Sequence, residues 1–132
     1  MLGVSEVVKE WESDMHFKRA KVALEKGKYD AAEEEFKRSL ELNEHHADSR
    51  SAYTKFLMEQ RRYEEAIEEL EKVNERLDSL EIHERLGESY YRTGEEEKAM
   101  EHWGMFFRRR PQNRRAYPGI YREYKRLERE NE

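Results

Sequence analysis

The residues of this 132-residue chain that could hold a metal are five histidines and many carboxylates. A helical zinc site of the HExxH type puts two imidazoles one turn apart on one face, and neither that motif nor its inverse occurs. His45 and His46 are adjacent in sequence and do not share a helix face. His83 and Glu84 lack a third ligand at a suitable spacing. The sequence therefore predicts no metal and no cofactor.

The sequence also lacks the motifs of other kinds of catalysis. The chain has no cysteine, which excludes disulfides, thiolate ligands and cysteine nucleophiles. No glycine-rich phosphate loop, GxSxG elbow or dinucleotide fingerprint is present. Glutamates are so abundant that a pair of them carries no information about acid–base chemistry. We expect a protein that is not an enzyme.

Composition limits what kind of domain can position these side chains. Charged residues make up 43% of the chain and hydrophobic residues 36%, which favours a thin core shared between stacked elements. Glycine and proline are few, and the dominant residues are helix formers. No apolar run approaches the roughly 18 residues that a membrane-spanning helix needs. The start lacks the features of a secretory signal, so we expect no membrane and a cytoplasmic location.

Three segments of the chain align with one another: "KGKYDAAEEEFKRSL", "QRRYEEAIEELEKVN" and "RTGEEEKAMEHWGMFF". Their small and large apolar residues recur at intervals of 34 and 33, as Ala32, Ala66 and Ala99 and as Phe36, Leu70 and Trp103. Another helical stretch precedes each segment. Each unit thus reads as helix, short turn, helix, and such a hairpin must stack on neighbours to bury its apolar face.

The predicted turns have a recurring signal of their own. Gly27 and Gly94 stand where the first helix of a unit must end, and glycine accepts the left-handed conformation found there. Arg61 takes the corresponding place in the second unit. The alanines allow close approach of two helices, and the large apolar residue four positions later fills the same face.

This pattern resembles the tetratricopeptide repeat family, whose motif is W-x2-L-G-x2-Y, then G, A-x3-F and P in about 34 residues. The third unit matches best, at Leu86, Gly87, Tyr90, Gly94, Ala99, Trp103 and Pro111. The first unit keeps Ala20 at the small position and the second has Thr54 there. The resemblance places the three repeats at 13–46, 47–79 and 80–113. It implies an all-α, right-handed superhelical solenoid that acts as a non-catalytic scaffold or adaptor for other proteins.

The two ends of the chain are expected to flank the repeats. Residues 114–132 hold tyrosines and leucine at helical spacing and read as a basic capping helix, with Pro118 in its first turn. Residues 1–12 form an amphipathic helical extension. It either packs on the first repeat or contacts a partner or a second copy through Trp11, and a homodimer could also form through the end caps.

The resemblance also implies a peptide groove lined by the first helix of each repeat. The positions that line this groove in the family correspond here to Phe17, Lys18, Lys21, Lys55, Met58, Arg85, Glu88, Tyr91 and Arg92. Only Arg85 agrees with the clamp that binds heat-shock-protein tails, so we expect no such clamp. The mixture of cations and apolar side chains instead fits a peptide or helix with acidic and apolar residues.

The C-terminal end is the one strongly basic part of an otherwise acidic chain. Residues 108–132 carry nine Lys/Arg against four Asp/Glu, whereas the whole chain has a net charge of −5. The cations expected to form a basic surface are Arg108, Arg109, Arg110, Arg114, Arg115 and Arg122. As an alternative to protein binding, these arginines could contact the phosphates of a nucleic acid. Cations at the end of a helix also complement the helix dipole, which accounts for part of the cluster.

Overall fold

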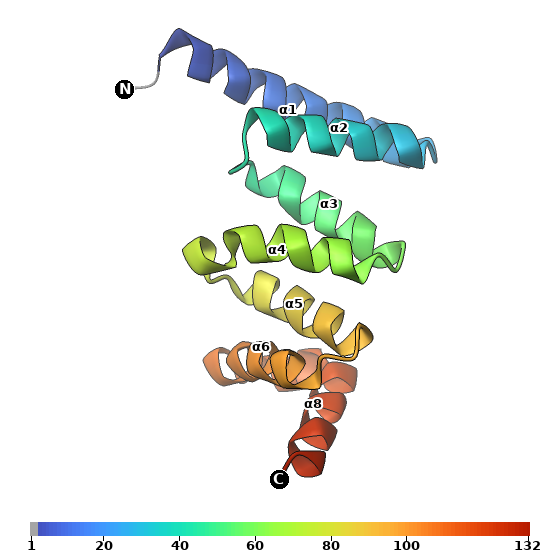
Figure 1. Cartoon of the computed structure of the whole chain (residues 1–132), viewed down its shortest axis with the longest axis vertical. Helices are drawn as coiled ribbons and strands as arrows, with labels where there is room; N and C mark the ends of the chain where they lie inside the picture. The colour runs from blue at the N-terminus through green and yellow to red at the C-terminus, as the bar shows by residue number, and fades with distance from the viewer. Residues whose placement is uncertain (1–2) are drawn as a thin grey trace. The chain divides into compact units, whose positions relative to one another are not determined.

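The computed structural model describes residues 3–132, with the backbone alone for Glu75. Figure 1 shows an all-helical chain, and no strand occurs within residues 3–132. The helices are α1 (Val4–Glu25), α2 (Tyr29–Leu42), α3 (Ala47–Glu59), α4 (Tyr63–Leu77), α5 (Leu80–Arg92), α6 (Glu96–Arg109), α7 (Asn113–Ala116) and α8 (Pro118–Glu130).

The chain divides into two compact units, and the division falls inside α3. The first unit ends at Phe56 and the second begins at Leu57. Unit 1 therefore holds α1, α2 and most of α3, whereas unit 2 holds the last turn of α3 and α4 to α8. Each unit has its own buried core.

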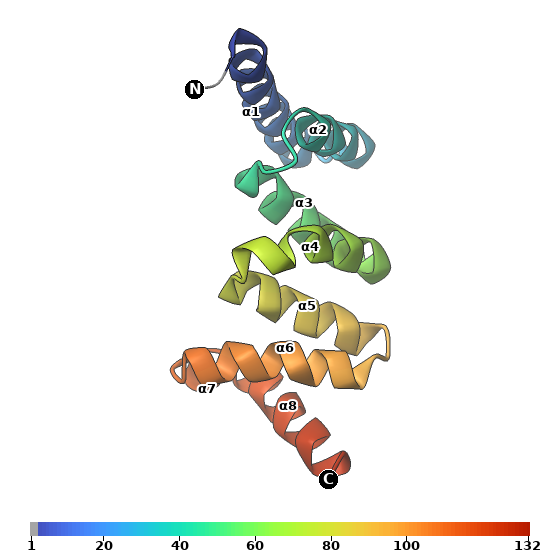
Figure 2. The same ribbon diagram turned by 60° about the vertical axis from the view of Figure 1, so that its left-hand side comes forward.

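In unit 1, α1 and α2 lie side by side as an antiparallel hairpin (Figures 1 and 2). Ala20, Ala32 and Phe36 are fully buried, as the repeat pattern predicts for two helices that approach closely. Phe36 also stacks on Tyr53 of α3 at 5.7 Å between ring centroids. One small and one large apolar residue thus fill the space between the helices.

Three buried serines, one from each helix of unit 1, were not expected from the sequence. Ser39 Oγ donates to the Ser13 carbonyl at 2.8 Å, and Ser13 Oγ donates back to the Ser39 carbonyl at 2.8 Å. Ser49 Oγ lies 2.6 Å from Ser39 Oγ. All three are fully buried, and each hydroxyl has a partner, so the close approach leaves none of these polar groups unsatisfied.

In unit 2, α5 and α6 form the hairpin of the third repeat, and α8 packs on α6 (Figure 2). Leu86 is fully buried and Trp103 is 2% exposed. A Cβ atom added at Gly87 would overlap the Trp103 indole, so only glycine leaves room for it. One turn further along α6, Phe107 meets Tyr121 and Tyr124 of α8 with ring centroids 5.0 and 5.5 Å apart.

The turn within each hairpin is built the same way three times. The second residue after the first helix has a positive φ, of 71° at Gly27, 60° at Arg61 and 86° at Gly94. The next amide donates back to a carbonyl of the helix, as from Lys28 to Ala23 at 2.9 Å. Arg61 adopts the conformation that glycine has elsewhere, which a non-glycine residue rarely does. The repeat geometry thus overrides the preference of this residue.

The flanking segments join the repeats in different ways. From Val4 onward, the expected N-terminal extension is the first half of α1, which continues without a break to Glu25; residues 1–2 lie outside the described residues. The C-terminal segment contains the short α7 and then α8, with Pro118 in the first turn of α8. Phe106 and Tyr117 pack edge to face at 5.1 Å across the connection between α6 and α8.

Candidate interaction site

The first set of predicted groove residues lies on one face of α1. Phe17 is half-buried and its ring lies 5.4 Å from that of His46, just before α3. The Lys21 ammonium sits 5.4 Å from the centroid of the Phe17 ring, a cation–π arrangement. Lys18 is exposed and pairs with Asp14 at 3.0 Å. The hydrogen bond from Lys18, followed by that from His46, holds the pKa of the Asp14 carboxyl below its usual range.

Lys55 belongs to the same unit and lies on the first helix of the next repeat. Its side chain is exposed. We name Phe17, Lys18, Lys21, His46 and Lys55 the unit 1 face. It combines cations with an aromatic ring, and the Asp14 carboxylate already compensates one of the charges.

The α5 residues predicted for the groove are more strongly engaged with their own chain. Arg85 has a side chain only 16% exposed and pairs with Glu81 at 2.8 Å. Arg92 lies 3.9 Å from Glu88. Burial, together with the nearby charges of Glu88 and Glu81, raises the pKa of Glu84. This helix face therefore offers little uncompensated positive charge.

Tyr91 is tied to the C-terminal helix. Its hydroxyl donates to Glu123 at 2.8 Å, and Arg126 donates to the Tyr91 hydroxyl at 3.3 Å. The ring also packs against Trp103, with 5.2 Å between centroids. Met58 is half-buried at the end of α3 and belongs to unit 2. The predicted groove residues are thus divided between the two units, with Phe17, Lys18, Lys21 and Lys55 in unit 1 and the others in unit 2.

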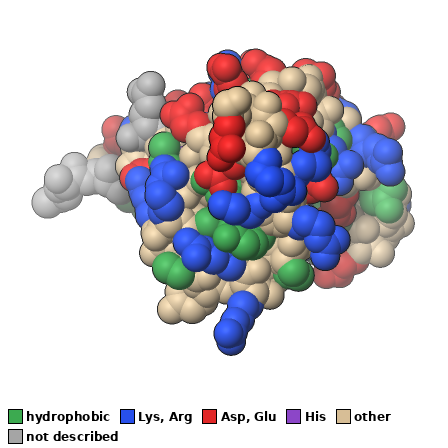
Figure 3. Space-filling model, turned by 90° about the horizontal axis from the view of Figure 1, so that it is seen from below, with side chains coloured by type: hydrophobic (Ala, Val, Ile, Leu, Met, Phe, Trp, Pro, Cys, Tyr) green, Lys and Arg blue, Asp and Glu red, His purple; other side chains and the backbone are tan. Residues whose placement is uncertain are grey.

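The predicted basic surface occupies the end of unit 2 formed by α6, α7 and α8. All six arginines are exposed. Seen from this end, Lys and Arg side chains spread across the surface between hydrophobic and acidic ones (Figure 3). Arg109 pairs with Asp78 at 2.9 Å, and Arg114 lies over the Tyr121 ring at 5.7 Å. Part of this charge is therefore used within the chain.

A buried pair of histidines in unit 2 was missed by the sequence reasoning, which treated His83 only as a metal ligand. His83 Nε2 lies 2.6 Å from Asp78 Oδ1, and His83 Nδ1 lies 2.8 Å from His102 Nδ1. The two rings stack at 5.1 Å, and His102 also stacks on Tyr90. No group of three or more metal-ligating side chains occurs within residues 3–132. His83 and His102 are hydrogen-bonded and packed between α5 and α6.

We predict that acid destabilises unit 2 through His102. Burial, followed by the neighbouring His83, lowers the pKa of His102 from its usual 6.5. The unfolded chain then binds the proton at a higher pH than the folded one does. The contribution of neutral His102 to the free energy of unfolding should be complete above pH 6.5. It should be lost as the pH falls through the pKa of His102 in the folded chain.

Urea unfolding at pH 7.5, 6.5 and 5.5 measures this dependence. His102→Gln should flatten it, because glutamine does not titrate. His45→Gln should leave it unchanged, because His45 lies exposed in the turn before α3. An unaltered slope in His102→Gln would contradict the assignment.

Comparison with protein-family models connects this geometry to known proteins. Two models described as "Tetratricopeptide repeat" match residues 23–79 and 57–104. Between them they cover the hairpin turns at Gly27, Arg61 and Gly94 and the packed pair Gly87 and Trp103. The chain belongs to the tetratricopeptide repeat family. The prediction of an all-α helical-repeat solenoid is thereby confirmed. No curated protein matches the chain closely enough to be compared with it.

Membership of the family indicates the general role. Tetratricopeptide repeats mediate protein–protein interactions and are typically non-catalytic modules. None of the helices within residues 3–132 is long and apolar enough to cross a membrane. The nucleic-acid alternative gains no support from the family match. Membership of the family therefore points to a protein as the kind of partner.

Proposed function

We propose that this tetratricopeptide repeat protein is a non-catalytic scaffold or adaptor that binds a partner peptide through its unit 1 face, in the cytoplasm. The peptide would carry acidic side chains for Lys18, Lys21 and Lys55 and an apolar side chain for Phe17. A homodimer through α1 or the end helices stays a separate prediction, and its α1 surface adjoins the unit 1 face at Lys18.

The observation that carries the proposal is a contrast between α1 and α5, the first helices of the first and third repeats. They differ in how far their cations and aromatic side chains are already engaged within the chain. On α1, Lys21 stands over the half-buried Phe17 ring, and no carboxylate among residues 3–132 lies within ion-pair distance of Lys21. On α5, Arg85 and Tyr91 are held by Glu81 and Glu123. An acidic peptide would therefore gain more at unit 1, where less of its charge must compete with the chain's own carboxylates.

We predict that changes on the unit 1 face weaken peptide binding at least about tenfold, as expected for loss of a central aromatic or charged anchor. A panel of labelled 15-residue peptides with graded acidic and apolar content would be screened by fluorescence polarisation. The tightest binder would then be titrated against Phe17→Ala, Lys21→Glu and Lys55→Glu. Circular dichroism would establish that each variant is folded.

Two control variants separate this face from others. Lys37→Glu reverses an exposed charge on α2, the second helix of the first repeat, and should leave the dissociation constant unchanged. Arg92→Glu tests the α5 face and should have less than a threefold effect. If Arg92→Glu abolished binding while Lys21→Glu did not, or if no peptide bound at all, the proposal would be wrong.

A further inference from the structure

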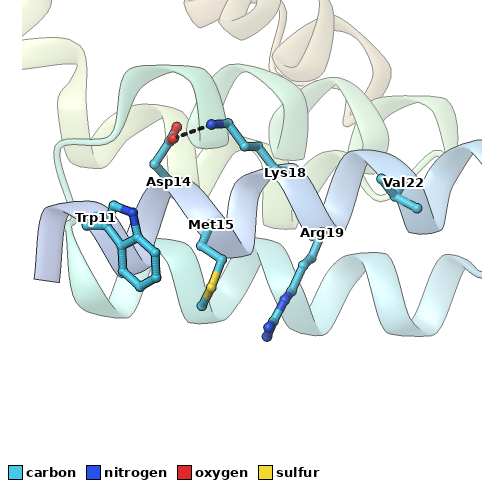
Figure 4. A pocket seen from close by; sticks show the side chains of 6 residues that line it. All are labelled: Trp11, Asp14, Met15, Lys18, Arg19 and Val22. Atoms are coloured by element: carbon cyan, nitrogen blue, oxygen red, sulfur yellow. Dashed lines mark ion pairs between the residues drawn. The ribbon is translucent and has the colours of Figure 1, made fainter. Parts of the chain in front are cut away.

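The first helix carries a second apolar face that nothing in the described part of the chain covers. Val4 is 84% exposed, Trp11 66% and Val22 47%, and Val8 lies on the same side. The opposite side of α1, with Ser13 and Ala20, is buried against α2. Figure 4 shows Trp11, Met15 and Val22 along the outer side of the helix, where they line a shallow depression with Asp14, Lys18 and Arg19.

A helix that is apolar on two opposite sides is expected to be buried on both. We name the outer row of Val4, Val8, Trp11, Met15 and Val22 the α1 stripe. Its members recur at intervals of four, three, four and seven residues, which keeps them on one side of the helix along its length. The stripe therefore has the pattern of a helix–helix contact.

Charge is distributed along α1 in a way that selects the orientation of a partner helix. Residues 4–14 carry four acidic side chains and one basic one, whereas residues 15–25 carry three basic and one acidic. Two copies of α1 side by side in parallel would bring like halves together. An antiparallel pair would instead place the acidic half of each copy beside the basic half of the other.

The two edges of the α1 stripe agree with this orientation. Glu12 and Arg19, seven residues apart, lie on one edge, whereas Asp14 and Lys18 lie on the other (Figure 4 shows Asp14, Lys18 and Arg19). In an antiparallel two-fold pair, equal edges of the two helices meet, so that residue i contacts residue j and j contacts i. Glu12 of one copy then meets Arg19 of the other, and this happens twice.

The pairs that this arrangement brings together share one centre. Val8 and Val22 are centred on residue 15, Glu12 and Arg19 between residues 15 and 16, and Asp14 and Lys18 on residue 16. A two-fold axis beside Met15 therefore places Met15 on Met15, Val8 opposite Val22 and Glu12 opposite Arg19. Asp14 and Lys18, which pair within each copy, also meet across the interface. Within residues 3–132 no carboxylate pairs with Arg19, so its charge is available to a second copy.

We propose that the α1 stripe binds the same stripe of a second copy of this chain, antiparallel, with the two-fold axis at Met15. The interface has the length of α1, about 33 Å for 22 residues. One helix pair lies at the small end of specific interfaces, so we expect a reversible dimer with a dissociation constant on the order of 10 µM.

Sedimentation equilibrium of the full chain between 1 and 300 µM tests the surface. The native chain should move from monomer to dimer, and Trp11→Glu should remain a monomer throughout. Leu77→Glu is the control, because Leu77 is also an exposed apolar residue, at 54% against 66% for Trp11, and lies on another helix. A native chain that stays monomeric would overturn the proposal, as would a dimer unaffected by Trp11→Glu. A higher oligomer would point to a different occupant and also overturn it.

Charge reversal tests the pairing of the edges. Glu12→Lys alone places a lysine beside Arg19 of the second copy, and Arg19→Glu alone places two glutamates together, so each should dimerise at least about tenfold more weakly. A mixture of the two variants restores opposite-charge pairing and should form a heterodimer. If the mixture associates no better than either variant alone, the antiparallel edge pairing is wrong.

Cross-linking tests the orientation directly, because the chain contains no cysteine of its own. Under mild oxidation, Met15→Cys should link to itself across the two-fold axis. Val8→Cys should link to Val22→Cys in a mixture, but neither should link to itself, since antiparallel equivalents lie far apart. Self-linking of Val8→Cys would indicate a parallel pair. That result would overturn the antiparallel assignment.

Discussion

Gly87→Ala should destabilise the protein by about 2–3 kcal/mol, although alanine in place of a mid-helix glycine is ordinarily stabilising. The reason is that the added methyl group would overlap the Trp103 indole. Trp103 is 2% exposed and packs against Tyr91, so the ring has little room to move aside. Thermal unfolding followed by circular dichroism should show a fall in Tm of roughly 8 °C.

A second substitution should rescue the first. The small and large positions lie sixteen residues apart in every repeat, and their sizes run inversely: Gly87 with Trp103, Ala20 with Phe36, and Thr54 with Leu70. Gly87→Ala combined with Trp103→Phe imports the pair of the first repeat and should recover most of the loss. Trp103→Phe alone should cost stability through the unfilled volume.

Gly119→Ala is the matched control for the glycine. It lies in the first turn of α8, and a Cβ there meets no atom within 4 Å. This change should be neutral or slightly stabilising. If Gly87→Ala behaved like Gly119→Ala, the close contact between α5 and Trp103 would be wrong.

Phe107→Ala should cost about 3–5 kcal/mol, the largest single effect that we expect in unit 2. Phe107 is 1% exposed, and its ring meets Tyr121 and Tyr124 of α8 as well as Phe106. Its loss leaves a cavity between α6 and α8. We expect α8 to open, so that residues 117–132 are cleaved by trypsin faster than α5 and α6 are.

Tyr117→Ala supplies the comparison. Tyr117 also packs on α6, through Phe106, but is 42% exposed, so its removal should cost no more than about 1 kcal/mol. Urea unfolding with tryptophan fluorescence measures both losses. Equal effects of the two substitutions would mean that α8 is held by something other than the Phe107 cluster.

Residues that repeat at a fixed interval were predictable from the sequence. The positions of Gly87, Trp103 and Gly94 recur in all three hairpins, and the Gly87–Trp103 contact is local to one hairpin. The same periodicity placed a turn at Arg61, where the residue type alone would not. The structure of helical repeats can be predicted from sequence periodicity because each unit contacts only its neighbours.

Polar groups that find partners across helices were not predictable. Ser13 and Ser39 have no periodic signal, and serines in helices are ordinarily read as exposed. His83 and His102 become partners only because α5 and α6 bring them within 2.8 Å. Tyr91 occupies a groove position by its spacing, but its hydroxyl partner Glu123 is 32 residues away on α8. Sequence spacing shows which face a residue occupies, not what meets it there.

The unbroken course of α1 from Val4 to Glu25 has a consequence for valency. The α1 residues of the unit 1 face and the α1 stripe lie on one helix with no turn between them, so a partner bound to one is oriented with respect to the other. Two copies joined through the stripe would hold two peptide sites in a set geometry. A partner with two copies of its motif could then bind both, and its avidity could exceed the single-site affinity by about 10²–10⁴.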